Sequence, residues 1–306
     1  MKKWLTLALL LLPLFAINVH ADALGSADTY AVLATTQVTN ATTFGDTVIT
    51  GDMGAVSCTG FVPSACGSAA AGTISGALNL SNGAYATALA DSNAAYVALG
   101  NSVPTTSLSA TSFDLGGSTL APGVYSIGST AGLTGTLTLN GGANLNPLWI
   151  FQIGTGLTTA SDSSLVITGA GAAAAGVYFR VGSAATLGDN TAFQGNILAG
   201  TAISFDPGAQ ITCGRAFTDT AGGTAVTFAG DNPAAVGGRP NIVTDSCVQS
   251  SSGFNGGVIA TIGDTPQVVA GSLAPVPEPG TWLLLGSGFV ALLGMARMKR
   301  VSTEVA

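Results

Sequence analysis

The sequence of 306 residues carries few charged side chains, and most of them are acidic. Between Asp22 and Ala274 it contains thirteen aspartates but no glutamate, no lysine and only three arginines, which leaves a net charge of −10. Such a lysine-free, acidic surface cannot neutralise the phosphates of a nucleic acid, so we expect no nucleic-acid partner. Of the arginines, we interpret Arg180 and Arg215 as structural rather than anion-binding.

The region from Asp22 to Ala274 also contains no histidine. The one histidine of the sequence, His20, precedes it. A serine or cysteine nucleophile needs a histidine or lysine as its base, and zinc needs clusters of histidine or cysteine. Three aspartates, Asp162, Asp189 and Asp206, follow repeated strand elements, and we interpret them as turn residues, with calcium ligation as the weaker alternative. The composition therefore predicts a protein that is not an enzyme and holds no metal or cofactor.

The N-terminal segment has the pattern of a secretory signal peptide. Met1 to Lys3 is basic, Trp4 to Ile17 is an apolar run, and Val19-His20-Ala21 is a small-residue cleavage site. A membrane anchor is the alternative, but a membrane span needs about 20 apolar residues. We expect secretion across the inner membrane and cleavage after Ala21.

The C-terminal end carries a second targeting pattern. Val276-Pro277-Glu278-Pro279 is followed by an apolar stretch from Trp282 to Ala296 and then by basic residues, which are Arg297, Lys299 and Arg300. This order resembles the PEP-CTERM sorting signal of Gram-negative bacteria, and its motif is Pro277, Glu278 and Pro279. The resemblance implies cleavage by an exosortase and sorting to the cell surface or the extracellular matrix, where extracellular polysaccharide is a candidate partner. An apolar helix of about 15 residues would be ~22 Å long, shorter than the ~30 Å hydrocarbon core, which suits a transient anchor.

Export exposes the four cysteines to an oxidising compartment, where they can form disulfides. Four cysteines allow three connectivities. We favour the pairs Cys58–Cys66 and Cys213–Cys247, because each closes a short loop.

Short strand-like runs bounded by Gly, Asn, Asp or Pro recur between the two ends of the chain. Their close spacing excludes a doubly wound α/β fold and suits a β-sandwich or a solenoid of short coils. We expect a signal peptide over 1–21, a β-domain over 22–232, a linker over 233–275 and the sorting signal over 276–300. The runs are Tyr30 to Leu33, Val124 to Ile127, Leu133 to Leu139, Leu148 to Ile153, Leu165 to Thr168, Val177 to Val181, Phe193 to Leu198, Ile203 to Phe205 and Val226 to Phe228.

One alanine-rich segment has a different period. Its larger apolar residues form a single stripe of an amphipathic helix. We expect this helix to cover about 20 residues, or ~30 Å, to lie along a flank of the solenoid and to stop near Gly100, before Pro104. The residues of the stripe are Leu78, Tyr85, Leu89, Tyr96 and Leu99.

A four-residue element recurs at 131–134, 155–158, 183–186, 201–204 and 224–227. It consists of a short residue, then Ala or Gly, then an apolar residue, then Thr or Ser, and its copies are 18 to 28 residues apart, the scale of one solenoid coil. Successive side chains of a strand point to opposite faces. The third residue of each copy should therefore lie in the core, while the second and fourth residues should form a flat outer face without charge. The predicted core residues are Leu133, Leu157, Ala185, Ile203 and Val226.

Such a face suits contact with ice. Strands repeat at ~4.7–4.9 Å and alternate residues along a strand at ~6.6–6.8 Å, both near oxygen spacings in crystalline ice. Threonine is stiff at χ1, so its methyl and hydroxyl groups keep fixed places at little entropic cost. Small outer residues are also common in other exported solenoids, so an adhesive matrix protein and a carbohydrate-processing enzyme stay open as alternatives.

The chain resembles a family of bacterial and fungal ice-binding proteins that fold as a discontinuous right-handed parallel β-helix with one long α-helix packed along it. The resemblance runs from about Leu24 to Phe228. The stretches that carry it include Thr47-Val48-Ile49-Thr50-Gly51-Asp52-Met53-Gly54, Leu120-Ala121-Pro122-Gly123-Val124-Tyr125, Trp149-Ile150-Phe151-Gln152-Ile153-Gly154 and Phe193-Gln194-Gly195-Asn196-Ile197-Leu198-Ala199.

The resemblance implies that a monomer binds the ice surface through one flat β-face, with a Thr-Ala/Gly-x-Thr/Asn motif. The copies at 155–158 and 224–227 match this motif, the copy at 201–204 has Ser for the last Thr, and the copies at 131–134 and 183–186 depart at the first position. The predicted ice-binding residues are Thr134, Thr136, Thr155, Thr158, Thr186, Thr201, Ser204, Thr224 and Thr227.

Overall fold

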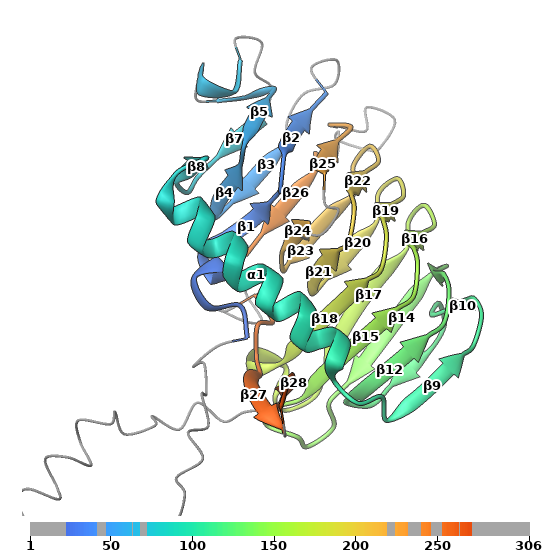
Figure 1. Ribbon diagram of the computed structural model, residues 1–306. Coiled ribbons are helices and arrows are strands. Elements are labelled where there is room, and N and C mark those ends of the chain that lie inside the picture. Colours follow the sequence, from blue (N-terminus) through green and yellow to red (C-terminus); the bar gives the residue numbers. More distant parts are fainter. Residues whose placement is uncertain are drawn as a thin grey trace, which may run out of the picture. The chain divides into compact units, whose positions relative to one another are not determined.

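Three sheets of parallel strands form the sides of a β-helix in the computed structural model (Figure 1). The structure describes residues 23–41, 47–62, 64–67, 72–218, 224–231, 240–245, 253–262 and 264–270. Each coil of the chain contributes a short strand to each sheet in turn, and glycine-rich corners separate the strands. The predicted β-helix with one long helix is therefore confirmed.

Along the stack, the strands of each sheet follow an order that differs from their order in the chain. Sheet A contains β8 (Leu78–Leu80), β4 (Asp52–Ala55), β1 (Tyr30–Leu33), β24 (Ala216–Thr218), β21 (Asn196–Ala199), β18 (Gly176–Val181), β15 (Leu148–Ile153), β12 (Gly123–Ile127) and β9 (Thr106–Ser109). Sheet B contains β10 (Phe113–Asp114), β13 (Ala131–Leu133), β16 (Leu157–Thr159), β19 (Ala185–Leu187), β22 (Ile203–Phe205), β25 (Ala225–Phe228), β2 (Gln37–Asn40) and β5 (Ser57–Thr59). Sheet C contains β11 (Thr119–Leu120), β14 (Thr136–Asn140), β17 (Ser164–Thr168), β20 (Ala192–Gln194), β23 (Gln210–Cys213), β26 (Ile242–Thr244), β3 (Val48–Thr50), β7 (Gly72–Ile74) and β6 (Phe61–Val62).

The stack is discontinuous in sequence. The first coils, β1 to β8, occupy one end; helix α1 (Gly83–Asn101) then carries the chain to the far end, and the coils from β9 onward return (Figure 1). The returning coils therefore meet the first coils in the middle of the stack. One pair of strands joins there in each sheet, with the register Val32↔Ala216, Val38↔Val226 and Ile49↔Val243.

The interior is filled by the inward side chains of all three sheets. The predicted core residues of the repeated elements are all buried there. Beside them, stacked aromatic rings run along the axis, with centroid distances of 5.4 Å between Tyr125 and Phe151 and 4.5 Å between Phe151 and Phe179. Parallel strands in register thus repeat the same inward position and build a continuous apolar column.

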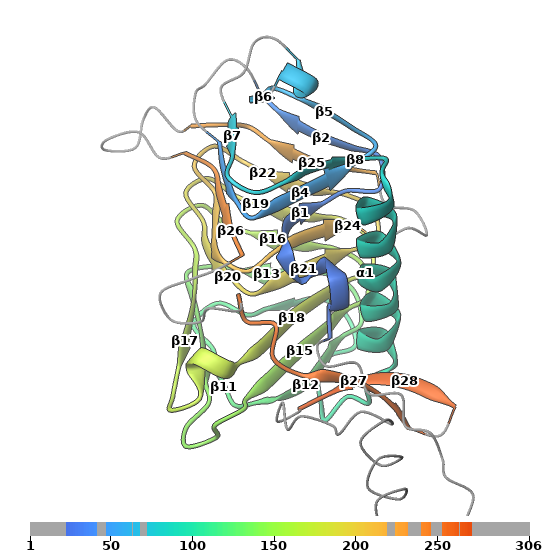
Figure 2. The same ribbon diagram turned by 90° about the vertical axis from the view of Figure 1, so that its left-hand side faces the viewer.

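Helix α1 lies along the outer face of sheet A (Figures 1 and 2). Tyr85, Tyr96 and Leu99 are buried against the sheet as expected, and the Tyr96 hydroxyl donates to the Val181 carbonyl at 3.1 Å. The helix begins later than the apolar stripe suggested, because Leu78 lies in strand β8, paired with Met53. Asn82 is the N-cap, and its side chain accepts a hydrogen bond from the Tyr85 amide at 2.8 Å.

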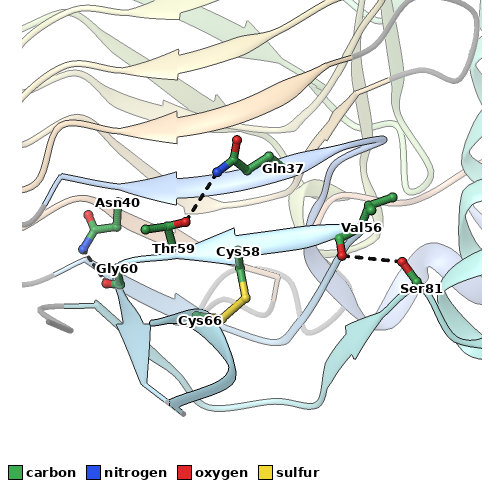
Figure 3. Close-up of a disulfide and its surroundings, with 8 residues drawn as sticks. All are labelled: Gln37, Asn40, Val56, Cys58, Thr59, Gly60, Cys66 and Ser81. Carbon is green, nitrogen blue, oxygen red and sulfur yellow. Dashed lines mark hydrogen bonds between the residues drawn. A yellow bond between two sulfur atoms is a disulfide. The ribbon is translucent and has the colours of Figure 1, made fainter. Parts of the chain in front are cut away.

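A disulfide joins Cys58 of β5 to Cys66 of the 3₁₀ helix η2 (Ser64–Cys66), as predicted (Figure 3). It lies at the end strand of sheet B and fastens the loop that follows it. Cys213 is also disulfide-bonded, whereas its predicted partner, Cys247, lies outside the described residues.

An antiparallel hairpin, β27 (Val258–Ile262) and β28 (Thr265–Val269), ends the described part of the chain. It packs beside the C-terminal end of α1 (Figure 2). There the Ser102 hydroxyl accepts a hydrogen bond from the Val268 amide at 3.1 Å. Within the described ranges, no helix is both long and apolar enough to cross a membrane.

Candidate functional site

The fourth residues of four repeated elements, those that end at Thr158, Thr186, Ser204 and Thr227, lie in a straight row on the outer face of sheet B, which we call face B. In every pair of neighbouring strands of sheet B, the residues at this position lie directly opposite one another. Six consecutive strands, β16 to β5, each place a hydroxyl in the row. The row runs Asp114, Gly132, Thr158, Thr186, Ser204, Thr227, Thr39 and Thr59.

A second row of outward residues lies two positions earlier in each coil, about 6.6–6.8 Å away along the strands. Most of its members are very small, which keeps the face even. Gln37 is the exception; its Nε2 donates to the Thr59 hydroxyl at 3.4 Å and so folds over the face (Figure 3). The row runs Ser112, Thr130, Gly156, Ala184, Ala202, Ala225, Gln37 and Ser57.

The first residues of the elements form the edge of face B, at the corner between sheets A and B. Their backbones are joined by a ladder of hydrogen bonds, in which the Thr201 amide donates to Ser183 O at 3.0 Å and the Thr224 amide to Thr201 O at 2.7 Å. The Thr36 amide continues the ladder to Thr224 O at 3.0 Å. Thr155, Thr201 and Thr224 therefore lie beside face B, one residue before its first outward row.

Two of the predicted site residues lie neither on face B nor at its edge. Gly132, not Thr134, pairs with Thr158, so the element in that coil begins at Ser129, two residues earlier than the sequence suggested. Thr134 follows β13 in a turn, where its amide donates to Asp114 Oδ1 at 2.9 Å. Thr136 begins β14 in sheet C. The prediction was wrong there because Ala131 and Leu133 both point inward, and a slip of two residues preserves the alternation of faces.

The sequence interpretation also missed part of face B. Thr39 and Thr59 extend the hydroxyl row, and Thr36 extends its edge. The signal was present in Thr36-Gln37-Val38-Thr39, which has the spacing of the element with Gln in place of Ala or Gly. This segment lies beside β25 because the coils are stacked in a discontinuous order. The spacing of the copies along the chain does not predict that order.

Face B is interrupted at one end. A shallow depression of about 320 Å³ opens at Gly132, where strands β16 to β5 each carry a hydroxyl, and it borders Asp114 and Thr130. Burial alone would raise the pKa of Asp114, but hydrogen bonds from the Gly116 and Thr134 amides outweigh it and lower that pKa. The carboxylate therefore stays charged at this end, and the even, uncharged part of the face runs from β16 to β5, about 24 Å at the usual strand spacing.

The other two outer faces are less even. The outer face of sheet A is largely covered by α1. The outer face of sheet C carries larger and more varied side chains, among them Val62 and Val166, which are 54% and 38% exposed. Face B is therefore the exposed face of small hydroxyl-bearing side chains in register.

The charged residues singled out in the sequence lie away from face B. Asp162 and Asp206 lie at the corner between sheets B and C, as the turn interpretation predicted. Burial and the neighbouring charge of Asp189 raise the pKa of Asp206. The described part of the chain contains no group of three or more His, Cys, Asp or Glu residues that could hold a metal ion.

Arg215 is structural, as predicted. Its guanidinium is 2% exposed and forms an ion pair with Asp28 at 2.6 Å. It also donates to Asn196 Oδ1 and to the Gly253 carbonyl, both at 3.2 Å. These bonds join the N-terminal 3₁₀ helix η1 (Gly25–Thr29), strand β21 and the segment before the C-terminal hairpin.

Comparison with known families agrees with this geometry. Residues 32–232 match the family model described as Ice-binding-like. The chain belongs to the Ice-binding-like family. Residues 275–300 match a second model, the PEP-CTERM protein-sorting motif.

Relatives within the Ice-binding-like family come from bacteria and fungi. An ice-binding protein of Nostoc sp. (strain HG1) is 39% identical, over 88% of this chain and 84% of that protein. The crystal structure of an ice-binding protein from the Antarctic ascomycete Antarctomyces psychrotrophicus has 36% identity and a TM-score of 0.60, and the match covers 73% of this chain and 97% of that one. An ice-binding protein from an Antarctic biological consortium has 30% identity and a TM-score of 0.61, over 74% and 92% of the two chains.

Proposed function

We propose that this protein binds ice through face B and that its adsorption inhibits ice growth and recrystallisation. The observation that carries the proposal is the row of six hydroxyls in register from Thr158 to Thr59. The names of its relatives, which are ice-binding proteins, support the same function.

The regular spacing of face B and its lack of long charged side chains suit it to contact with ice. The threonines of the row repeat with the strands at ~4.7–4.9 Å, and the second row lies ~6.6–6.8 Å away. Each threonine has a restricted χ1, so little side-chain entropy is lost when it docks. Methyl groups restrict the nearby water while hydroxyls and backbone amides anchor it, so the ordered water layer can merge with the crystal.

The cellular setting of the proposal comes from the two ends of the chain. We propose export through the signal peptide over 1–21, cleavage by an exosortase at the sorting signal, and display of a monomer at the surface or in the extracellular matrix of a Gram-negative cell. The match of residues 275–300 to the sorting motif supports this route. Ice would be the partner of the β-helix predicted over 22–232, and extracellular polysaccharide a second contact. The predicted linker over 233–275 is partly built into this fold, because strand β26 lies within sheet C and the hairpin of β27 and β28 packs beside α1. Binding of this kind is adsorption and needs no catalytic group.

Freezing-point measurements on the purified full chain test the proposal. Thr158→Tyr and Thr227→Tyr each place a bulky ring on face B, whereas Thr136→Tyr places the same ring on sheet C. We expect the first two variants to lose most of the thermal hysteresis and the third to keep it. Unchanged hysteresis in both face B variants would contradict the proposed site.

The main alternative is an adhesive or structural matrix protein. It predicts binding to cells or polymer without any effect on ice growth, and so an unmodified chain without thermal hysteresis or ice-plane affinity. That outcome would overturn ice binding itself rather than only its location.

A further inference from the structure

The outer face of sheet A changes from apolar to polar where α1 ends. One register row crosses the sheet at this level, and its first residues, Leu33, Phe217 and Leu198, are buried in a cluster with the helix. The same row continues on the next four strands with polar side chains only. They are Arg180, Gln152, Ser126 and Ser107.

These four side chains line a recess of about 250 Å³ beside Gly100, in the last turn of the helix. Ligand pockets for drug-sized molecules are about 300–1,000 Å³, so this recess suits a molecule of monosaccharide size. Gln152 is already engaged in its wall, because its Nε2 donates to the carbonyls of Leu99 and Ser102 at 2.7 and 2.6 Å. These hydrogen bonds from Gln152 hold the C-terminal end of α1 against sheet A and so fix one wall of the recess.

Arg180 brings to the recess a positive charge that no carboxylate of the described residues pairs with. Its guanidinium carbon lies 4.2 Å from the centre of the Tyr96 ring, and its Nε is buried without a hydrogen-bond partner. Within the described ranges, Arg215 forms an ion pair and Arg180 does not. A guanidinium that lines a recess and has no carboxylate partner among the described residues indicates a place for an anion. The structural interpretation therefore explains Arg215 but not Arg180.

We propose that this recess binds the carboxylate of a sugar acid, such as a uronic acid. A guanidinium pairs with a carboxylate through two parallel hydrogen bonds, and a single arginine balances a singly charged carboxylate better than a doubly charged phosphate. The hydroxyls of Ser107 and Ser126 lie in the same row and can both donate to and accept from sugar hydroxyls. The site lies on sheet A, so occupation of the recess leaves face B free.

Calorimetric titration of the full chain with glucuronate, glucose and inorganic phosphate tests the site. We expect glucuronate to bind, glucose to bind at least tenfold more weakly, and the glucuronate affinity to fall as salt is added. An oligomer of glucuronate, compared at equal residue concentration, distinguishes a residue within a polysaccharide from a free sugar acid. Equal binding of glucose and glucuronate, tighter binding of phosphate, or no binding of any probe would overturn the proposal.

Two variants locate the site. Arg180→Gln removes the charge, and Ser126→Leu fills the recess while Arg180 stays in place; each should weaken glucuronate binding at least tenfold. The control, Thr168→Leu, changes an exposed residue of sheet C and should bind like the parent chain. Thermal hysteresis, which we assign to face B, reports whether each variant is folded. If Arg180→Gln does not fold, Ser126→Leu decides the matter, and undiminished binding in it would disprove the assignment.

Discussion

Thr39 and Thr227 lie side by side on face B, with their hydroxyls 3.4 Å apart, although they are 188 residues apart in the sequence. Each is flanked by a further hydroxyl, Thr59 beside Thr39 and Ser204 beside Thr227. The centre of the proposed ice-binding row is therefore assembled from both halves of the chain.

The first prediction concerns this junction. Thr39→Tyr should abolish most of the thermal hysteresis, because the ring would stand in the middle of an otherwise even row. Thr136→Tyr is the matched control on sheet C and should behave like the parent. Ice binding confined to the returning coils would leave Thr39→Tyr fully active, a result that would refute the extended row.

The second prediction is a gain of function at the interrupted end. A Cβ added at Gly132 would meet its nearest neighbour, the Asp114 carboxyl, at 3.6 Å, an ordinary van der Waals distance. Gly132→Thr should therefore be accommodated, fill the depression and extend the hydroxyl row by one strand. We expect thermal hysteresis to increase roughly in proportion to the added strand, with Gly132→Ala in between. A lower activity in a variant with unchanged unfolding temperature would count against the flat-face mechanism.

The third prediction compares the two arginines that the structure describes. Arg215→Gln should lower the free energy of unfolding by about 3 kcal/mol, because it leaves Asp28 without its buried partner and breaks the bonds to Asn196 and Gly253. Arg180→Gln removes a guanidinium without an ion pair and should cost less than about 1 kcal/mol. Urea unfolding of both variants measures the difference, and equal losses would show that the Arg215 network contributes little.

The fourth prediction is a pH dependence at the corner between sheets B and C. Burial and Asp189 raise the folded-state pKa of Asp206 above 3.8, so the folded protein retains this proton to a higher pH than the unfolded chain does. The carboxylate therefore reduces stability at neutral pH, and the penalty fades as the pH falls towards 3.8.

Asp206→Asn should accordingly stabilise the fold at pH 7 by roughly 0.5 kcal/mol. A shift of one pKa unit would correspond to about 1.4 kcal/mol, but the carboxyl group is partly solvated, which reduces the effect. Asp189→Asn should give part of the same gain, and the double variant should be less than additive. Thermal unfolding at pH 7 and pH 3.5 is the measurement. A gain that is as large in acid as at neutral pH would point to packing instead of charge.

The alternation of small and apolar residues was enough to predict the inward and outward positions of face B. Leu157, Ile203 and Val226 are buried as expected, and Thr158 and Thr227 point outward on neighbouring parts of one sheet. Alternation has a period of two, however, so it could not distinguish Gly132 from Thr134.

Longer-range features needed other information. The spacing of seven between Leu78 and Tyr85 fits a helix, yet Asn82 caps the helix between them and Leu78 extends a strand. The resemblance predicted a discontinuous β-helix, but the order of its coils was not predicted. The pairing of β2 with β25 joins residues far apart in the chain, and neither strand carries a local pattern that indicates its partner. The sequence did not distinguish Arg180 from Arg215. They differ because the fold brings the Asp28 carboxylate to Arg215 and not to Arg180.

The return of the chain along α1 has a consequence for how the protein matures. The row on face B becomes continuous only when β25 docks against β2, so it cannot form from the N-terminal coils alone. Contacts so distant in sequence form slowly, since a long loop must close before they contribute. A chain exported from its N-terminal end would therefore acquire its flat face last, outside the cytoplasm, when nearly the whole domain has emerged.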